Sequence, residues 1–121
     1  MNDVKNYTDL LVWQKSMDLV EEVYRSIRCL PKDEIYALSS QIRRAVVSIP
    51  SNIAEGQQRR STKDFVYFLS VARGSNAELQ TQLYICRRLG YLQKSQIEPS
   101  IQLSNEIGRM LNSLIKKLSD N

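Results

Sequence analysis

The sequence predicts an all-α protein, an antiparallel up-down four-helix bundle with a proline-kinked second helix. Four stretches of the chain carry apolar residues mostly at steps of three and four, the spacing that lines one face of an α-helix. Short segments with Pro, Gly and helix-capping residues separate these stretches. The 121 residues include only 4 Gly and 3 Pro, which argues against long disordered or turn-rich β segments. A chain of this length suits one domain, residues 1–121, around one hydrophobic core.

The first helix is expected to begin at Thr8, which is a good N-cap because Asp9 follows it in the first turn. The helix should end before Pro31, since a proline cannot continue it. The apolar stripe that is expected to face the core consists of Trp13, Met17, Val20, Tyr24 and Ile27.

The second helix is expected to start at a cap formed by Asp33 and to reach about Gly56, where glycine offers a left-handed C-cap. Pro50 lies inside it and removes one amide donor. Because the apolar spacing continues past Pro50, we expect a kink and not a break. The stripe consists of Ile35, Leu38, Ile42, Ala45, Ile49 and Ile53.

The third helix is expected to begin at Ser61, whose partner Asp64 stands three residues on, as in a capping box. Its stripe consists of Phe65, Phe68, Ala72, Leu79, Leu83 and Cys86. The small residues at 74–76 interrupt this stripe, and we expect them to permit close approach of a neighbouring helix. Gly90 should close the helix.

The fourth helix repeats the capping pattern with Ser95 and Glu98, and Pro99 fits its first turn. Its stripe consists of Ile97, Ile101, Ile107, Leu111, Leu114 and Leu118. The connections between the four segments are short, which favours antiparallel neighbours.

The residue types that most enzymes and metal sites use are scarce. Histidine, the commonest general base and transition-metal ligand, is absent. Cys29 and Cys86 both fall at apolar helix positions, where a free cysteine behaves as a small hydrophobe. We therefore expect no enzymatic activity, no metal and no cofactor. The absence of an apolar run of the ~18 to 20 residues that span a bilayer, and of a signal peptide, predicts a cytoplasmic protein without a membrane partner.

The positive charge is concentrated in the middle of the chain, because residues 39–91 carry a net charge of +5, whereas the whole protein carries +4. Arginine dominates there, and its planar fork suits phosphate groups. The candidate nucleic-acid-binding residues are Arg43, Arg44, Arg59, Arg60, Lys63, Arg73, Arg87 and Arg88. Ion pairing between subunits, with Asp18, Glu21 or Glu22, is the alternative for the first two. Tyr84, on the same helical line as Arg73 and Arg87, could stack on a base but is more readily packed against a subunit.

Several polar residues stand beside the apolar stripes at helical spacing, where an unpaired buried group would cost ~1 to 3 kcal/mol. We expect them to pair across helices or subunits, and Trp13 to anchor helices or subunits. The residues assigned to this polar packing or subunit interface are Trp13, Asn52, Glu55, Glu78 and Gln82. A catalytic or metal-binding role would require Glu55 and Glu78 to converge in space.

Three runs of sequence carry a family resemblance: DLLVWQK at 9–15, QIRRAVVSIPSNIAEG at 41–56 and FLSVARGSNAELQTQL at 68–83. The chain resembles the four-helix bundle proteins encoded in bacterial 23S rRNA intervening sequences, a family that includes the accessory protein of diversity-generating retroelements. Ala37 and Leu30 depart from residues that are usual in the family, Gly and Phe. The resemblance implies a homopentamer with a central channel and a basic surface. In the retroelement branch it implies binding to RNA or DNA and to a reverse transcriptase.

The leading hypothesis is therefore an oligomeric accessory protein that binds nucleic acid through a basic surface. The second is a structural or protein-interaction scaffold, which predicts no salt-sensitive binding to RNA or DNA. The third, an enzyme, predicts a pocket in which Glu55, Glu78, Tyr or Lys side chains converge.

Overall fold

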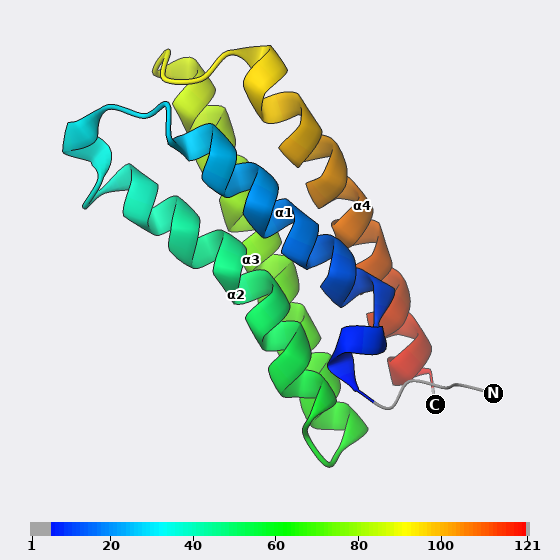
Figure 1. Cartoon of the computed structure of the whole chain (residues 1–121). Helices are drawn as coiled ribbons and strands as arrows, with labels where there is room; N and C mark the ends of the chain where they lie inside the picture. Colours follow the sequence, from blue (N-terminus) through cyan, green and yellow to red (C-terminus); the bar gives the residue numbers. More distant parts are fainter. Residues whose placement is uncertain (1–5, 121) are drawn as a thin grey trace.

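The computed structural model describes residues 6–120. Four long helices run up and down in turn and pack as an antiparallel bundle (Figure 1), which confirms the predicted fold class. Each helix contacts two others, because α1 packs against α2 and α4, and α3 packs against the same two. The elements in chain order are the 3-10 helix η1 (Tyr7–Asp9), α1 (Leu11–Ile27), the 3-10 helix η2 (Lys32–Glu34), α2 (Leu38–Gln57), α3 (Thr62–Arg88) and α4 (Lys94–Ser119).

The core lies along the axis between the four helices and is built from leucine, isoleucine and valine. Burying each of these side chains contributes roughly 1.5 to 3 kcal/mol, so the helices are held chiefly by packing. The largest fully buried side chains are Leu19, Val23, Ile42, Val46, Ile49, Ile53, Leu69, Leu79, Leu83, Leu92, Ile107 and Leu111.

The start of α1 differs from the prediction that Thr8 caps it. Asn6 caps η1 instead: its Oδ1 accepts a hydrogen bond from the Thr8 amide at 3.1 Å. The Asp9 carboxylate in turn accepts from the Asn6 amide at 3.2 Å. Because this reciprocal box favours a separate 3-10 turn, α1 begins only at Leu11, with no side-chain cap.

The buried face of α1 is rotated by about one residue from the predicted stripe. The residues that face the core are Val12, Ser16, Leu19, Val23 and Ile27. Of the predicted stripe, Ile27 alone is buried, whereas Met17 and Tyr24 are each 38% exposed. The helix carries two adjacent apolar stripes, and spacing alone favours the one without Ser16. The Ser16 hydroxyl can be buried because it donates to the carbonyl oxygen of Val12 at 2.7 Å.

The second helix begins later than predicted, at Leu38, and Asp33 lies in η2 instead of capping it. Glu34 takes the capping contact, because its carboxylate accepts from the Leu38 amide at 3.3 Å. Ile35 consequently precedes the helix and is 45% exposed. The helix continues through Pro50 as expected, and the bend at that residue stays a prediction.

Gly56 is not the left-handed C-cap that its position suggested. It lies inside α2 and is buried, and among the described residues only Gly90 has a positive φ, of 79°. A Cβ atom at Gly56 would lie 2.7 Å from the Cβ of Phe68 and 3.0 Å from Cδ1 of Phe65. The glycine is therefore required for the close packing of α2 on α3.

The third helix begins and ends as predicted. The Ser61 hydroxyl accepts from the Asp64 amide at 3.1 Å, and Gly90 follows the last turn in the left-handed conformation. The prediction of close approach holds for Ser75 and Asn76, which bond to α2 and α4 respectively. It is wrong for Gly74, which is exposed and has open space where a side chain would stand.

The fourth helix begins two residues earlier than predicted, because its N-cap is Gln93 and not Ser95. The Gln93 amide donates to the Gln96 side chain at 2.7 Å, and Gln93 forms the N-cap of this capping box. Pro99 consequently lies in the second turn and not in the first. Ile97, Ile101, Ile107 and Leu111 are buried as predicted.

Candidate nucleic-acid interface

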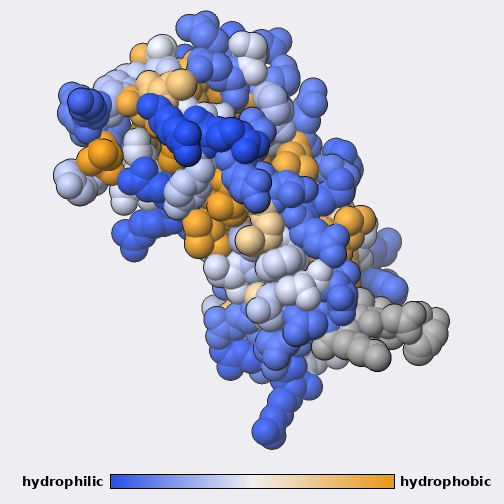
Figure 2. Space-filling model, in the orientation of Figure 1, coloured by the Kyte–Doolittle hydropathy of each residue, from blue (hydrophilic) through white to orange (hydrophobic). Residues whose placement is uncertain are grey.

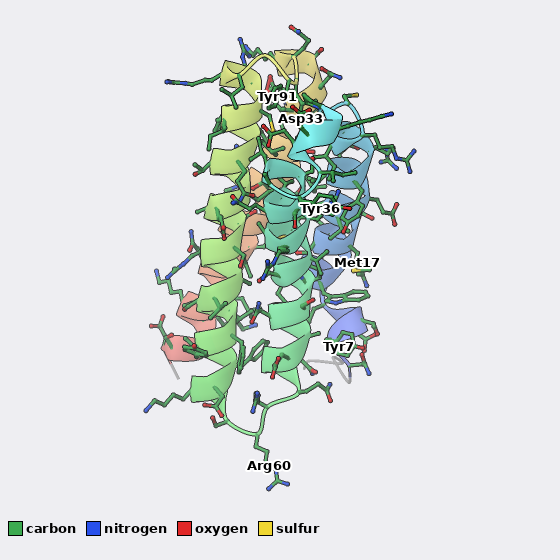
Figure 3. The ribbon with its side chains drawn as sticks, turned by 90° about the vertical axis from the view of Figure 1, so that its left-hand side faces the viewer. Tyr7, Met17, Asp33, Tyr36, Arg60 and Tyr91 are labelled. Carbon is green, nitrogen blue, oxygen red and sulfur yellow. The ribbon has the colours of Figure 1, made fainter. Side chains whose placement is uncertain are left out.

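The loop between α2 and α3 places three of the predicted cations at one end of the bundle. Arg60 projects outward from the tip of this loop (Figure 3). The Arg59 side chain instead packs against the bundle. Its guanidinium pairs with the Glu55 carboxylate at 2.5 Å and lies 4.8 Å from the centre of the Phe68 ring. Lys63 is exposed in the first turn of α3. Arg60 and Lys63 thus remain available to an anionic partner.

Arg43 and Arg44 have different surroundings although they are adjacent in sequence. Arg43 is half-buried and donates to the carbonyl oxygen of Ile35 at 3.1 Å, which ties α2 to the segment before it. Arg44 is exposed and borders a groove between α2 and α3 that Ser48, Ser75 and Glu78 also line. Both arginines are accessible, and neither forms an ion pair with a residue in the described range.

The line of residues that begins at Arg73 lies beside α4. Arg73 donates to the side chain of Asn112 at 3.1 Å. Gln80 donates to Ser104 and to Asn105, each at 2.8 Å, so its amide serves contact between helices. Tyr84 is 49% exposed, and no described residue forms a ring contact with it. Its ring is therefore accessible to a base or to a second subunit.

Arg87 and Arg88 are exposed in the last turn of α3, at the far end from the α2–α3 loop. At a rise of about 1.5 Å per residue, roughly 36 Å of helix separates Lys63 from Arg87. The eight predicted cations therefore do not form one patch on a single chain. Of these eight, Arg59 alone pairs with a carboxylate of the described part of the protein.

None of the polar residues predicted to pair across helices bonds directly to another of the described helices, and Asn52 does so only through Ser48. The Asn52 amide donates to the Ser48 hydroxyl at 2.8 Å, and that hydroxyl shares a hydrogen bond with Ser75 at 2.8 Å, which links α2 to α3. Gln82 bonds only within its own helix, to Glu78 at 3.4 Å, and its Oε1 is buried without a partner among the described residues.

Trp13 is half-buried against the core, and its ring meets that of Tyr7 edge-on at 5.5 Å. It therefore anchors η1 to α1, which agrees with a role between helices. Whether it also contacts a second subunit stays a prediction.

Glu55 and Glu78 do not converge. Glu55 is next to Gly56, which packs at the level of Phe68, and Glu78 lies ten residues further along α3. That interval corresponds to about 15 Å of helix. Residues 6–120 also contain no cluster of three or more His, Cys, Asp or Glu side chains that could hold a metal ion. Glu55 and Glu78 therefore do not form the carboxylate pair that the enzyme hypothesis placed there.

A polar network between α3 and α4 was not predicted. Asn76 is 5% exposed and donates to the carbonyl oxygen of Ser104 at 2.9 Å, and the Ser104 hydroxyl donates back to Asn76 Oδ1 at 2.6 Å. A Cβ atom at Gly108 would approach the Asn76 amide to 3.3 Å. In the sequence, each of these two helices has a polar residue at a core position. The spacing of residues along one helix does not show that the two polar residues meet.

The two cysteines differ from each other. Cys29 is exposed after the end of α1, so its prediction as a buried helix residue is wrong. Cys86 is fully buried as expected, and burial, assisted by the negative charge of Glu34, raises the pKa of its thiol to about 11. The hydroxyl of Tyr91 donates to Glu34 at 2.8 Å, which raises the pKa of Tyr91.

Sequence reasoning missed two cations that lie near Arg43. Arg28 and Lys32, with Tyr24 and Arg43, line a cavity of about 290 Å³ between the end of α1 and the start of α2. Arg28 and Lys32 flank Pro31 in the sequence, but they lie outside the basic middle segment that the charge count singled out.

The geometry defines a class of protein: a compact antiparallel bundle with unpaired cations distributed over its surface. Residues 8–113 match the model of the 23S rRNA-intervening sequence protein family, and the chain belongs to this family. None of its helices in the described range has the length and hydropathy needed to cross a membrane.

A similar solved structure is that of a protein of unknown function from the S23 ribosomal protein family of Bacteroides thetaiotaomicron VPI-5482. The two chains are 30% identical and superpose with a TM-score of 0.81, over 88% of this chain and 99% of the other. No curated protein matches the chain significantly. The comparisons thus establish the family and the fold.

Proposed function

We propose that this protein is a non-enzymatic, oligomeric accessory protein of the cytoplasm that binds RNA or DNA through arginine and lysine side chains. The observation that carries the proposal is the set of cations without a carboxylate partner. Seven of the eight residues singled out in the sequence make no ion pair with any residue of the described range. Unpaired Arg and Lys side chains are the groups that bind phosphates and release counterions.

Self-association makes a dispersed set of cations effective. One chain separates its cations into groups at the two ends and the middle, whereas symmetric copies would bring several groups to one surface. Apolar side chains remain exposed on the described surface, and Figure 2 shows such patches among hydrophilic residues. We propose the homopentamer that the family resemblance implies. A reverse transcriptase is the proposed protein partner if the chain belongs to the retroelement branch.

A protein-interaction scaffold is the second candidate, and the exposed apolar residues favour it. The exposed fractions of the Met17, Val47 and Ile85 side chains are 38%, 41% and 40%. Exposed apolar surface of this kind commonly marks a protein contact. In this case the arginines would serve subunit or partner contacts, and nucleic acid would not bind.

The test is fluorescence anisotropy of labelled single- and double-stranded RNA and DNA with the assembled protein across a salt series. Binding is expected to weaken with salt, and each lost phosphate contact should flatten the logarithmic salt slope by about 0.7 to 0.9. The variant Arg60→Gln/Lys63→Gln removes two unpaired cations of the α2–α3 loop. It should weaken binding and lower the slope.

Arg25→Gln provides the control, because Arg25 already pairs with Glu22 at 3.1 Å and is expected to contribute less to binding. Salt-sensitive binding that the loop variant weakens more than the control would support the proposal. No binding at low salt by the assembled oligomer would refute it and favour the scaffold.

A further inference from the structure

We propose that the cavity between the end of α1 and the start of α2 holds a single nucleotide unit of single-stranded nucleic acid, with its base against Tyr24 and its phosphate on the surrounding cations. This inference rests on the proposed function and names the part of the nucleic acid that this cavity would recognise. The cavity has a volume of about 290 Å³. Sites for small molecules have volumes of about 300 to 1,000 Å³, so this cavity lies at the lower limit of that range. It has room for one nucleotide and not for a dinucleotide cofactor.

Three cations from three different segments meet around this cavity. Arg28 follows the last turn of α1, Lys32 begins η2 and Arg43 extends from α2. None of them pairs with a carboxylate of the described residues. Arg43 donates one hydrogen bond, to the carbonyl oxygen of Ile35, and this contact orients the guanidinium while its other N–H groups make no hydrogen bond to a described residue. A phosphate would satisfy such converging donors.

The nearby carboxylates form no ion pair with these cations, and this includes Asp33, which adjoins Lys32 in the sequence. Glu22 is engaged by Arg25, and Glu34 accepts hydrogen bonds from the Leu38 amide and from the Tyr91 hydroxyl. The cations also lie where the carbonyl groups of α1 end, and part of their charge offsets the negative end of that helix dipole. Offsetting the helix dipole does not require an aromatic residue or a cavity. Because both are present here, the cations are suited to a ligand as well.

The remaining walls are suited to a base. Tyr24 presents a ring that is 38% exposed, and Ile35 adds an apolar side chain that is 45% exposed. Tyr36 is 96% exposed beside them in the sequence and lies on the face of the bundle that Figure 3 turns to the viewer. Every base has a face that can stack on an aromatic ring, which makes such a site tolerant of sequence.

Ser39 supplies a polar group in the same cavity. The residue is 3% exposed and lines the cavity, and its hydroxyl makes no hydrogen bond to a described residue. It is also absent from the side-chain atoms that are buried without a partner, so it retains contact with the cavity space. A hydroxyl in this position can donate to or accept from a base edge or a sugar.

The experiment compares a short fluorescent single-stranded oligonucleotide with an abasic oligonucleotide of the same length, which keeps the phosphates and lacks the bases. The assembled full-length protein should bind the abasic strand about five- to a hundredfold more weakly, the range expected for one stacked base. Tyr24→Leu should remove this difference by weakening binding of the complete strand alone. Tyr24→Phe should preserve it.

Tyr67→Leu is the matched control, because Tyr67 is an exposed tyrosine of α3 that does not line this cavity, and it should leave the ratio unchanged. Arg28→Gln/Lys32→Gln should weaken binding of both strands and flatten their salt slopes. Thermal melting checks that each variant is folded.

Equal affinity for the two strands, or an unchanged ratio in Tyr24→Leu, would overturn the inference while the proposed function stood. If no oligonucleotide binds, the proposed function fails, and titration of a free mononucleotide decides the inference separately. Mononucleotide binding that Tyr24→Leu weakens would then support the cavity as a nucleotide site. Absence of that binding would reject it.

Discussion

Gly56 shows how one residue sets the distance between two helices. Its missing side chain lets the backbone of α2 approach Phe65 and Phe68 of α3. In the sequence this glycine resembled a helix terminator, since a polar loop follows it. Its actual role depends on which residues of α3 stand opposite, and local sequence does not contain that information.

We predict that Gly56→Ala destabilises the protein. The new Cβ atom would stand 2.7 Å from the Cβ of Phe68, which is attached to the backbone and cannot rotate away. Overpacking costs about 1 to 3 kcal/mol, which should exceed the gain of up to roughly 1 kcal/mol from replacing a helical glycine. Thermal and urea unfolding measure the difference.

Gly74→Ala is the matched control, because this glycine also lies in a helix but has nothing within 4 Å of the added atom. It should be neutral or stabilise by up to roughly 1 kcal/mol. Equal unfolding free energies for Gly56→Ala and Gly74→Ala would contradict the packing account.

At the scale of the helices, the sequence predicts the number, order and type of elements, and it is less informative about their orientation. In α1, the stripes that contain Met17 and Leu19 are both apolar. Only the positions of α2 and α4 decide which of them is buried. The helix caps were likewise predicted only in part. Ser61 and Gly90 cap α3 as expected. Thr8, Asp33 and Ser95 do not cap their helices, because neighbouring residues make the capping hydrogen bonds instead.

We predict that Ser61→Ala weakens the start of α3 by about 0.5 to 2 kcal/mol, because the Asp64 amide would lose its acceptor. Ser95→Ala should have little effect, since Ser95 is exposed inside α4 and Gln93 provides the cap. Denaturant unfolding of the two variants compares them directly. A larger loss for Ser95→Ala would show that Ser95 and not Gln93 caps α4.

At the scale of the whole molecule, the sequence correctly indicated an antiparallel bundle of four helices. It also indicated a basic middle segment, but sequence proximity does not imply proximity in space. The 27 residues of α3 carry Lys63 to one end of the bundle and Arg87 to the other. The cavity near Arg43 combines residues of three elements, and for that reason Arg28 and Lys32 were not recognised.

We predict that Val47→Glu lowers the mass of the assembled protein. Val47 is 41% exposed on α2, and a charge there would have to be buried if this face contacts another subunit. Light scattering after size-exclusion chromatography measures the mass. Gln102→Glu introduces the same carboxylate at an exposed position of α4 and should leave the mass unchanged.

A monomeric wild-type protein would exclude the proposed assembly. If the wild type is oligomeric and Val47→Glu has the same mass, the subunits meet through another face of the bundle. In that case the exposed residues of α3, such as Tyr84 and Ile85, become the next surface to change.

The hydrogen bonds between Asn76 and Ser104 have a consequence for the longitudinal register of α3 and α4. Leucine and isoleucine contacts tolerate sliding, because a shift by one turn, about 5.4 Å, places another apolar residue in a similar environment. A reciprocal amide–hydroxyl pair does not tolerate it, because the same shift would leave buried donors and acceptors unpaired. The two polar residues thus select one alignment among several that the apolar core alone would accept, and they keep the ends of the bundle in fixed relative positions.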